Sequence, residues 1–505
     1  MVRQVGIINY KDTRMDLSDI SFGDRVAENE ASELASYFVK TDDWAQLRAG
    51  KIDVVFGAKG AGKSALYTLL NQDSQDFEDS GILLMSAEKP TGQTVFSEIK
   101  NEPPTSEAEF VGLWKVYICQ LIVESLLRRG RCTGEAEAVR LKLVEAELIE
   151  ERNTLKRFVN SAMLFAKRMV SIESVEGGGS LAGDVSGKIT FRTPDNAKKK
   201  LGFFSVDELL EKLNQHLIDE KISTWLLFDR LDVAFDEDPD LEKNALRALF
   251  KTYRDVEDLD AIFLKIFLRD DIWKKITDDG FRESSHITRT TTIKWSHQGL
   301  LNLIVNRILR NKVIGGEYKV EADEVSNDQA KQLELYYKLF PEQVDVGEKQ
   351  SQSFDWILNR VKDGLGDIAP REFIHFYNEV LNNQKAADRI GASKPEGTNI
   401  FSRQAIKDAT FEVSKVRTEQ NVFAEYASLK PFILRLEKSK AEHNLDTLSR
   451  VWGLPPEDTK RVAGELVAIG FFENRAAKDE GIYKVPFMYR PYLEITQGKA
   501  FSGQS

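Results

Sequence analysis

Glycines, a lysine and a serine are spaced in this sequence so that together they could hold a phosphate group. The segment KIDVVFGAKGAGKSALYTLL begins at Lys51, and the pattern G-x-x-x-x-G-K-S falls on Gly57, Gly62, Lys63 and Ser64. Glycines let the backbone turn tightly and bring its N–H groups against an anion. The lysine adds a positive charge for the outer phosphates, and the serine adds a hydroxyl for Mg²⁺. The spacing therefore predicts a phosphate-binding loop that holds a nucleoside triphosphate.

The residues around this loop decide between a functional motif and a chance match in a glycine-containing turn. The motif requires a preceding strand and a following helix, whose positive N-terminal end also favours an anion. The apolar, β-branched run 52–56 has the character of a strand, and residues 64–70 have the character of a helix. The predicted nucleotide-binding residues are Gly57, Ala58, Lys59, Gly60, Ala61, Gly62, Lys63, Ser64 and Ala65.

A second candidate for nucleotide chemistry lies in the segment STWLLFDRLDVAFD, where an apolar run ends in acid. Residues 225–228 predict a buried strand, and Asp229 at its end could accept the Mg²⁺ shell that Ser64 holds from the other side. Apolar runs that end in Asp are common, so the signal depends on the phosphate loop upstream. Asp232 follows three residues later and could either act on the nucleotide or cap the following loop.

Arg269 ends a third apolar run, in the segment AIFLKIFLRDDIW. In open α/β sheets, ligands bind at the carboxyl ends of the strands, so Arg269 is a candidate for contact with the γ-phosphate. The alternative is a surface ion pair with Asp270 or Asp271.

Length and composition indicate a large protein of two to four domains with reduced cysteines. The chain has 505 residues and a net charge of −11, from 81 acidic and 70 basic residues, which argues against a generally basic nucleic-acid-coating protein. Cys119 and Cys132 fit no metal-ligand spacing. We expect no signal peptide and no segment with the roughly eighteen apolar residues of a membrane span, and hence a cytoplasmic protein without a membrane partner.

The order of the remaining elements predicts alternating strands and helices. We expect short helices over 27–39 and 42–49, a strand over 81–86 and an amphipathic helix over 110–128. Ser205 and Glu208 have the S-x-x-E spacing of a capping box at the start of another helix.

A heptad-like pattern lies between the two nucleotide motifs. Its apolar positions are Leu141, Val144, Leu148, Leu155, Phe158, Ala162, Phe165 and Met169. A continuous helix or hairpin of up to about 50 Å, projecting from the core to dock a partner, fits the pattern at about 1.5 Å per residue. An ordinary helix packed on its own domain fits it as well. The glycine-rich stretch that follows predicts a loop or small hairpin.

Several motifs together resemble AAA-type ATPases of the STAND and origin-initiator kind. They are the loop at 57–64 and the segments LLFDRLD, LKIFLRDD, IKWS and DIAPREFIHFYNEVL, and the resemblance spans roughly residues 20–495. The chain looks most like the stand-alone bacterial members, many of which sit in anti-phage defence loci.

The resemblance implies ATP and Mg²⁺ as cofactors and roles for three further residues. Asp232 would polarise the attacking water, Arg269 would be the first sensor, and Pro370 would open a lid helix whose Arg371 touches nucleotide. The predicted catalytic residues are Lys63, Asp229, Asp232, Arg269 and Arg371. Arg230 stands where many AAA ATPases carry Glu, which favours a slow switch over rapid hydrolysis.

The predicted fold class is α/β, with a P-loop, AAA-like core around a parallel sheet. The expected parts are an N-terminal helical segment (1–50), the core (51–297, with a helical or coiled-coil insertion at about 134–200), a helical lid (298–420) and a winged-helix domain (421–505). The winged helix rests on the pattern of helix, turn, helix and two short strands after Leu445. Its second helix begins with Glu457 and Asp458, which would repel DNA phosphate, so a structural or protein-contacting role is favoured.

Three functional classes remain open at this point. The first is an ATP-driven switch in defence or signalling, acting as a homo-oligomer or with a protein effector. The second is a DNA-binding initiator or remodelling ATPase. The third is a coiled-coil ATPase resembling the SMC and ABC group. That group has a serine-glycine-glycine signature, which GGGSLAGD matches poorly, and an acidic residue directly after the Mg²⁺-binding Asp, where this chain has Arg230.

Overall fold

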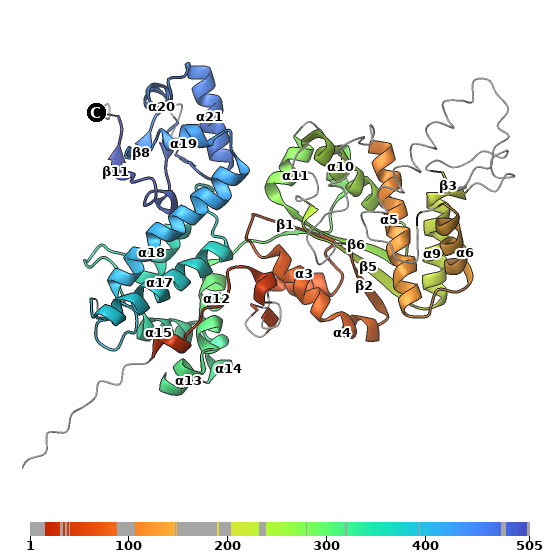
Figure 1. Ribbon diagram of the computed structural model, residues 1–505, viewed down its shortest axis with the longest axis horizontal. Helices are drawn as coiled ribbons and strands as arrows, with labels where there is room; N and C mark the ends of the chain where they lie inside the picture. The colour runs from red at the N-terminus through yellow and green to blue at the C-terminus, as the bar shows by residue number, and fades with distance from the viewer. Residues whose placement is uncertain are drawn as a thin grey trace, which may run out of the picture. The chain divides into compact units, whose positions relative to one another are not determined.

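The protein forms two compact units, each described below by itself (Figure 1). The computed structural model describes residues 16–30, 34–35, 38–39, 41–87, 107–146, 148, 189–190, 204–231, 239–278, 280–318, 321–392, 394–475 and 481–501. The parallel-sheet unit consists of residues 40–293, and the helical unit consists of residues 1–39 and 294–505. The chain therefore passes between the units twice. The division splits the predicted segment 1–50 and lies close to the predicted core boundary at 297.

A five-stranded parallel sheet forms the centre of the parallel-sheet unit. Its strands are β1 (Val54–Gly57), β2 (Ile82–Ser86), β5 (Ser223–Phe228), β6 (Ile262–Arg269) and β7 (Thr290–Thr292). The spatial order is β2-β5-β6-β1-β7, and every neighbouring pair is parallel. The α/β fold with a P-loop core is confirmed by this sheet and by the strand–loop–helix unit at its centre. The strands predicted at 52–56, 81–86, 225–228 and before Arg269 are all present.

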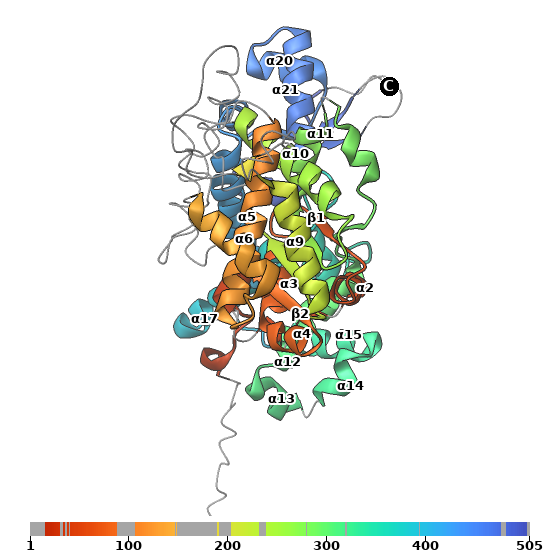
Figure 2. The ribbon, with the colours of Figure 1, turned by 90° about the vertical axis from the view of Figure 1, so that its right-hand side faces the viewer.

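Helices cover both faces of this sheet, which explains its nearly continuous apolar strands (Figures 1 and 2). On one face, the even-numbered residues of β6 pack in a core with helices α5 (Glu107–Arg128), α6 (Gly134–Glu145), α9 (Val206–Asp219) and α10 (Pro239–Val256). On the other face, Tyr67 of α3 (Lys63–Gln72) contacts Phe267, and Phe77 of α4 (Ser74–Asp79) contacts Trp225.

Local sequence signals set several helix boundaries in this unit. The capping box at the start of α9 is confirmed, with Ser205 and Glu208 exchanging hydrogen bonds of 3.1 and 3.0 Å. Helix α2 (Asp42–Arg48) begins after the cap residue Thr41 and is followed by Gly50 with a positive φ of 72°. The remaining elements of the unit are α11 (Asp270–Thr277), η5 (Arg282–His286) and the short pair β3 (Ile189–Thr190) and β4 (Phe204–Ser205).

Of the alternatives that the heptad-like pattern allowed, a single continuous helix from Leu141 is wrong. Helix α6 ends at Glu145, and Ala146 caps it. The side chains of α6 that face the core are Ala136, Val139 and Leu143, whereas Leu141 and Val144 of the predicted heptad are 54% and 42% exposed. Leu148 is fully buried in the same core. The described beginning of the heptad therefore belongs to the domain, and its remaining positions, 155–169, lie outside the described residues.

Helix α5 is more apolar than the sequence analysis expected. It has 22 residues, and among the described helices it has the length and apolar composition of a membrane span. Most of its apolar stretch is buried, because α5 packs against α10, α9 and α6. These contacts identify it as the central core helix of the unit, and they also bury Cys119.

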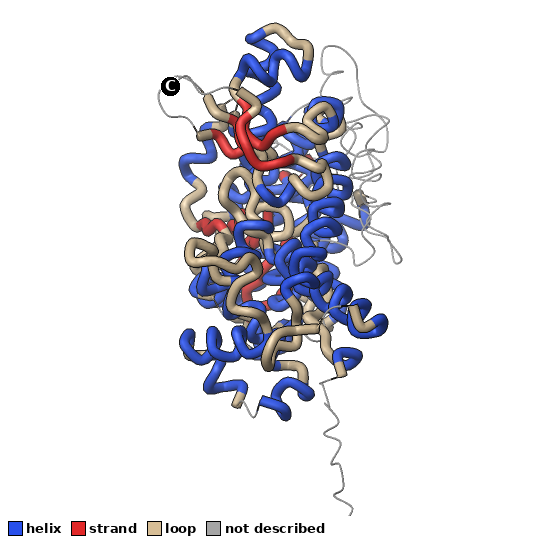
Figure 3. Tube along the Cα trace, turned by 90° about the vertical axis from the view of Figure 1, so that its left-hand side faces the viewer, coloured by secondary structure: helices blue, strands red, loops and turns tan. Residues whose placement is uncertain are grey.

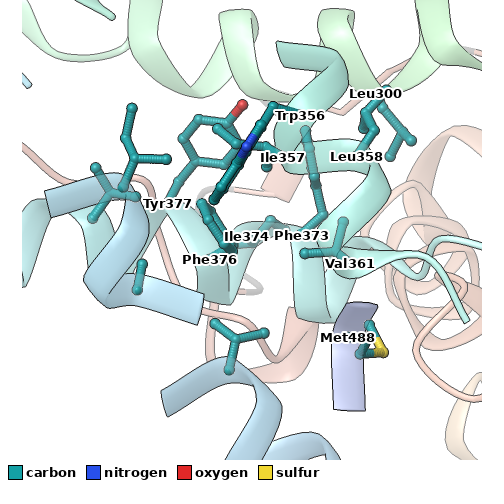
Figure 4. Packing of buried hydrophobic residues seen from close by; sticks show 14 of the residues in the cluster. Leu300, Trp356, Ile357, Leu358, Val361, Phe373, Ile374, Phe376, Tyr377 and Met488 are labelled. Carbon is teal, nitrogen blue, oxygen red and sulfur yellow. The ribbon is translucent and has the colours of Figure 1, made fainter. Parts of the chain in front are cut away.

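The helical unit is built around a helical body with its own apolar core. The body contains α12 (His297–Leu309), α13 (Lys312–Tyr318), α14 (Ala322–Ser326), α15 (Gln329–Leu339), α16 (Ser353–Val361), α17 (Pro370–Ile390) and α18 (Arg403–Val416). Aromatic and branched side chains of α16 and α17 pack together, and Met488 from near the C-terminus joins them (Figure 4).

The N-terminal residues complete this helical core. Its first elements are the 3₁₀ helices η1 (Leu17–Asp19) and η2 (Ala27–Glu30). Phe22 is fully buried and contacts the ring of Tyr377, with centroids 5.7 Å apart. Glu30 forms a buried ion pair with Arg307 of α12 at 3.0 Å. Residues 16–30 therefore belong to the helical unit by their packing, although the chain runs from them into the other unit.

The C-terminal module, residues 440–501, has the predicted order of helix, turn, helix and two short strands (Figure 3). Its helices are α20 (Leu445–Trp452) and α21 (Pro456–Ala468), and its sheet contains β8 (Lys440–His443), β9 (Glu473–Asn474), β10 (Tyr483–Lys484) and β11 (Thr496–Lys499) in the order β11-β8-β10-β9. The sequence analysis missed β8 and β11. The π-helical segment η6 (Arg417–Phe423) and α19 (Lys430–Leu434) connect α18 to the module.

Candidate functional site

The predicted phosphate loop has the backbone that its glycines require. Strand β1 ends at Gly57, and α3 begins at Lys63. Gly60 and Gly62 have positive φ angles of 82° and 110°, a region that residues with a side chain rarely adopt. A Cβ on Gly57 would lie 3.2 Å from the Cβ of Ala61. The loop therefore turns sharply between a buried strand and a helix N-terminus, the arrangement that presents backbone N–H groups to an anion.

The ammonium group of Lys63 lies against this loop. Its Nζ donates hydrogen bonds to the carbonyl oxygens of Gly57 at 2.7 Å and of Ala58 at 3.0 Å. The lysine thus holds its charge against the backbone of the turn, where a phosphate could replace these carbonyl partners.

The ends of the parallel strands bring Asp229 and Arg269 to the same edge of the sheet as the loop. Asp229 follows β5 directly, and it is 6% exposed. Arg269 ends β6, and its Cα is paired with that of Gly57 in the ladder between β1 and β6. Because all five strands run in one direction, their carboxyl ends share this edge. The ends of β1, β5 and β6, which carry or adjoin Gly57, Asp229 and Arg269, therefore lie at one edge of the sheet.

Arg269 forms the ion pair that the sequence analysis kept as its alternative. Its Nε and Nη2 donate to the two carboxylate oxygens of Asp271 at 3.0 and 2.7 Å. The side chain of Arg269 is 15% exposed, and that of Asp271 is 45% exposed. Such a two-point contact fixes the plane of the guanidinium group, so the pair is compatible with a positioned phosphate sensor.

The oxygen donors at this edge fit Mg²⁺. Ser64 follows Lys63 in the first turn of α3, and Asp229 offers a carboxylate. Hard cations of this kind bind through one or two protein oxygens together with phosphates and water. No group of three or more His, Cys, Asp or Glu within the described ranges could hold a metal ion by itself. A bound Mg²⁺ would therefore take its other ligands from nucleotide and solvent.

A buried ionic cluster that was not predicted from the sequence connects the neighbouring strands β6, β1 and β7. Asp53, just before β1, lies 2.6 Å from Lys265 of β6 and 2.6 Å from Arg289, which precedes β7. The hydroxyl of Tyr253 donates to Asp53 at 3.2 Å. Burial lowers the pKa of Lys265 and, with the charge of Asp53, raises the pKa of Tyr253. Lys265, a charged residue inside the apolar run IFLKIFLR, was the sequence signal for this cluster. Its ion pair with Asp53 helps to hold β1 and β6 together, the strands that end in Gly57 and Arg269.

Two predicted site residues cannot be placed at this edge. Asp232 lies outside the described residues. Arg371 is in the helical unit, in the first turn of α17, which begins at Pro370 as predicted. Its Nε is buried without a hydrogen-bond partner. The adjacent Glu372 pairs with Arg417 at 3.0 Å. Arg230, beside Asp229, has a positive φ of 54°.

Comparison with known proteins gave weak structural similarity only. No family model matches the chain, and no curated protein matches it. The ORC1 protein of Aeropyrum pernix in complex with DNA is 11% identical with a TM-score of 0.38, over 93% of this chain and 96% of that one. A Walker-type ATPase of Pyrococcus abyssi is also 11% identical with a TM-score of 0.38, over 91% and 96%. The Aeropyrum pernix ORC2 protein with ADPNP and ADP is 12% identical with a TM-score of 0.30, over 95% and 98%.

Proposed function

We propose that this protein binds ATP with Mg²⁺ and hydrolyses it, and that nucleotide occupancy switches its conformation or assembly. The observation that carries the proposal is the turn from Gly57 to Lys63. It has two glycines with positive φ, it leads into a helix N-terminus, and the lysine ammonium group is hydrogen-bonded to its backbone. These groups would bind the triphosphate through positive charge and N–H donors. Positioning and electrostatic stabilisation of this kind account for most of the catalysis of phosphoryl transfer.

We also propose a role for each of the further predicted residues. Asp229 and Ser64 would hold Mg²⁺, which neutralises charge on the outer phosphates when bound. Arg269 would orient toward the γ-phosphate from the strand next to the loop. Asp232 would orient the attacking water, since Arg230 occupies the position directly after Asp229. The absence of a carboxylate at position 230 supports a slow switch.

The surface of α21 supports a protein-contacting role for the C-terminal module over a DNA-reading one. Arg461 pairs with Glu465 at 2.7 Å and lies 4.0 Å from Asp458, so its charge is balanced within the helix. Glu457 and Asp458 add negative charge in the first turn. A helix that enters the major groove needs uncompensated positive charge near phosphate. We therefore propose a homo-oligomer or a protein effector as the partner, in a bacterial defence or signalling assembly, as the sequence resemblance implies.

The switch is tested by the oligomeric state and the ATPase rate of the full chain. Light scattering after size-exclusion chromatography, with and without ATP and Mg²⁺, should show a nucleotide-dependent change in mass or hydrodynamic radius. ATPase rates measured with and without duplex DNA across a salt series should be the same within error. A rate that DNA stimulates at low salt and that falls steeply with added salt would favour the initiator function instead.

A further inference from the structure

Among the described residues of the helical unit, three positively charged side chains gather around the ring of Phe487. This residue begins the 3₁₀ helix η7 (Phe487–Tyr489) and is partly exposed. The guanidinium carbon of Arg490 lies 4.1 Å from the ring centroid, and that of Arg360 lies 4.5 Å from it. The ammonium nitrogen of Lys484 lies 5.9 Å away. All three are within the roughly 6 Å at which a cation is attracted to an aromatic ring.

Arg360 of α16 contacts a second ring and has little compensation from acidic groups. Its guanidinium carbon lies 3.7 Å from the centroid of the Trp356 ring, and its one hydrogen bond among the described residues is long, 3.5 Å to the Trp356 carbonyl oxygen. The nearest described carboxylate, Asp345, is 4.0 Å away and lies closer to Lys407, at 2.7 Å. A guanidinium group that stacks on a ring keeps its N–H donors in its own plane. Because 20% of its side chain is exposed, Arg360 can offer such donors to a ligand from solvent.

Lys484 of β10 also lacks a close counterion. Its nearest described carboxylate is that of Glu473 at 3.8 Å, and Glu473 lies closer to Arg475, at 2.8 Å. Burial and the charge of Arg475 lower the pKa of Lys484. The Lys484 side chain is only 12% exposed, so its ammonium group has lost part of its hydration without gaining a close carboxylate in return.

Arg490 is the most buried of the three cations, and its hydrogen-bond partners are neutral. Its Nε donates to the carbonyl oxygen of Val485 at 2.8 Å, and its Nη1 donates to the side chain of Gln497. Its Nη2 is buried without a hydrogen-bond partner. Burial lowers the pKa of both Arg490 and Arg360 to about 10, so both groups stay charged at neutral pH. Buried charges are costly unless an opposite charge balances them, and an anion bound here would supply that charge.

The surroundings of the three cations favour a single carboxylate over a long polyanion. Asp345 and Glu473 lie beside them, with 38% and 39% of their side chains exposed. A nucleic-acid backbone that reached both Arg360 and Lys484 would bring further phosphates close to these acids, which repel them. One acidic side chain would avoid this repulsion, and the guanidinium group of arginine binds a carboxylate through two parallel N–H donors.

We infer that Arg360, Lys484 and Arg490 form a binding site for a carboxylate that an acidic segment of a protein partner supplies. The inference rests on the proposed function only for the class of partner, because it gives the chemistry of the protein contact proposed for the C-terminal module. The contacts that carry it all lie within the helical unit. It requires neither nucleotide nor the phosphate loop.

The test is the fluorescence anisotropy of a labelled hexaglutamate peptide, titrated with the full chain at physiological salt without nucleotide. Wild type should bind this peptide and should not bind hexaglutamine with the same label. Arg360→Gln and Lys484→Gln should each weaken the binding of hexaglutamate by about fivefold or more, which corresponds to one lost ion pair of about 1 kcal/mol. Lys484→Arg, which keeps the charge, should bind nearly as wild type does.

Arg461→Gln is the matched control, because it removes the same charge from α21 of the same module, where the Arg461 side chain is 62% exposed. This variant should keep the wild-type affinity for the peptide. Thermal unfolding of each variant beside wild type shows whether it is folded. If Arg360→Gln is destabilised, Lys484→Gln decides, since Lys484 has no carboxylate closer than 3.8 Å to leave unpaired.

Four results would overturn the inference. They are no binding of hexaglutamate to wild type, undiminished binding in both glutamine variants, and an equal loss in Arg461→Gln, which would show general charge attraction. The fourth is a labelled DNA duplex that binds more tightly than hexaglutamate and is weakened by the same two variants, because the site would then serve nucleic acid. The ATPase rate and the nucleotide-dependent mass are measured separately, so none of these results decides whether the protein is an ATP-driven switch.

Discussion

At the level of single residues, the proposed site has one set of groups for phosphate binding and a second set for hydrolysis. Lys63 and the backbone of the loop form one set, fixed by local geometry between Gly57 and α3. Asp229 and Arg269 form the other and depend on the sheet, because they are distant in sequence and meet the loop only through strand order. This division predicts that the two sets fail differently when changed.

Asp229→Asn should reduce hydrolysis far more than ATP binding. The change weakens the hold on Mg²⁺ but leaves the loop and Lys63 intact, so we expect a loss in kcat of roughly 10² or more and a change in ATP affinity of less than about tenfold. Single-turnover hydrolysis and equilibrium binding measure the two effects. Asp278→Asn, at the end of α11, removes the same charge elsewhere and should change neither. Equal loss of binding and turnover in Asp229→Asn would refute the separation.

At the scale of elements, strand pairing and helix ends follow from residues that act in pairs. The Asp53 carboxylate is the clearest case, since it contacts side chains that come from or adjoin β6, α10 and β7. A buried carboxylate with three partners holds them in register, and its loss leaves an unpaired lysine inside the protein.

Asp53→Asn should lower the free energy of unfolding by about 3–5 kcal/mol, the usual cost of breaking a buried ion pair from one side. Chemical denaturation of the full chain measures this value. Asp79→Asn, at the end of α4, should change stability by less than about 0.5 kcal/mol because its side chain lies near the surface. A loss of less than about 1 kcal/mol in Asp53→Asn would show that the cluster contributes little.

The start of the heptad offers a matched pair of substitutions. Leu148→Glu should be strongly destabilising, by several kcal/mol, because it forces a charge into a fully buried position. Leu141→Glu should change stability by no more than about 0.5 kcal/mol, since Leu141 is 54% exposed on α6. Thermal unfolding of the two variants beside wild type measures both. If Leu148→Glu left the stability of the protein unchanged, the heptad-like segment would again be a candidate surface for docking a partner.

Sequence patterns predicted the elements whose signal is local. They failed where packing against other helices determines which face of a helix is buried. The loop, the strands around Trp225 and Phe267 and the capping box at Ser205 follow from residues a few positions apart. The phase of α6 could not be read in the same way, because Val139 and Leu143 fit a helix face as well as Leu141 and Val144 do. Packing against α5 and α9 buries the face with Val139 and Leu143 and leaves Leu141 and Val144 exposed.

At the level of the whole molecule, Asp229, Arg269 and Arg371 could be proposed as site residues from the sequence, but the residues around them could not be predicted. The order of the strands places Asp229 and Arg269 at the same edge of the sheet as the loop. Arg371 belongs to the other unit, where the partners of its neighbour Glu372 lie about fifty residues later in the chain. Long-range pairs of this kind leave no local signature, so the hydrogen bonds from Arg417 and Asn421 to Glu372 could not be predicted from spacing.

Asp363, in the turn before α17, predicts an effect of pH on stability. Burial raises the pKa of Asp363 to about 6, against the pairing with Arg417, which lowers it. The nearby titratable groups are Arg417, Asp367 and Tyr489. Because the folded protein holds this proton more tightly than the unfolded chain, whose pKa is about 4, the contribution to stability is complete below about pH 4 and is lost as the pH rises through about 6.

Asp363→Asn, which imitates the protonated form, should therefore gain stability relative to wild type as the pH is raised from about 4 to about 7. Denaturation of both proteins across this range gives the difference, with a ceiling of about 3 kcal/mol for a shift of this size. A difference that is constant with pH would show that Asp363 titrates normally.

ATP binding to the phosphate loop is best measured by calorimetric titration of wild type and of the Lys63→Ala variant with ATP and Mg²⁺. Wild type should bind one nucleotide per chain, and Lys63→Ala should lose that binding, or at least its turnover, because the substitution removes the ammonium group that lies against Gly57 and Ala58. Lys51→Ala, just before β1, is the matched control and should bind as wild type does. A Lys63→Ala protein that binds and hydrolyses ATP at the wild-type level would contradict the account.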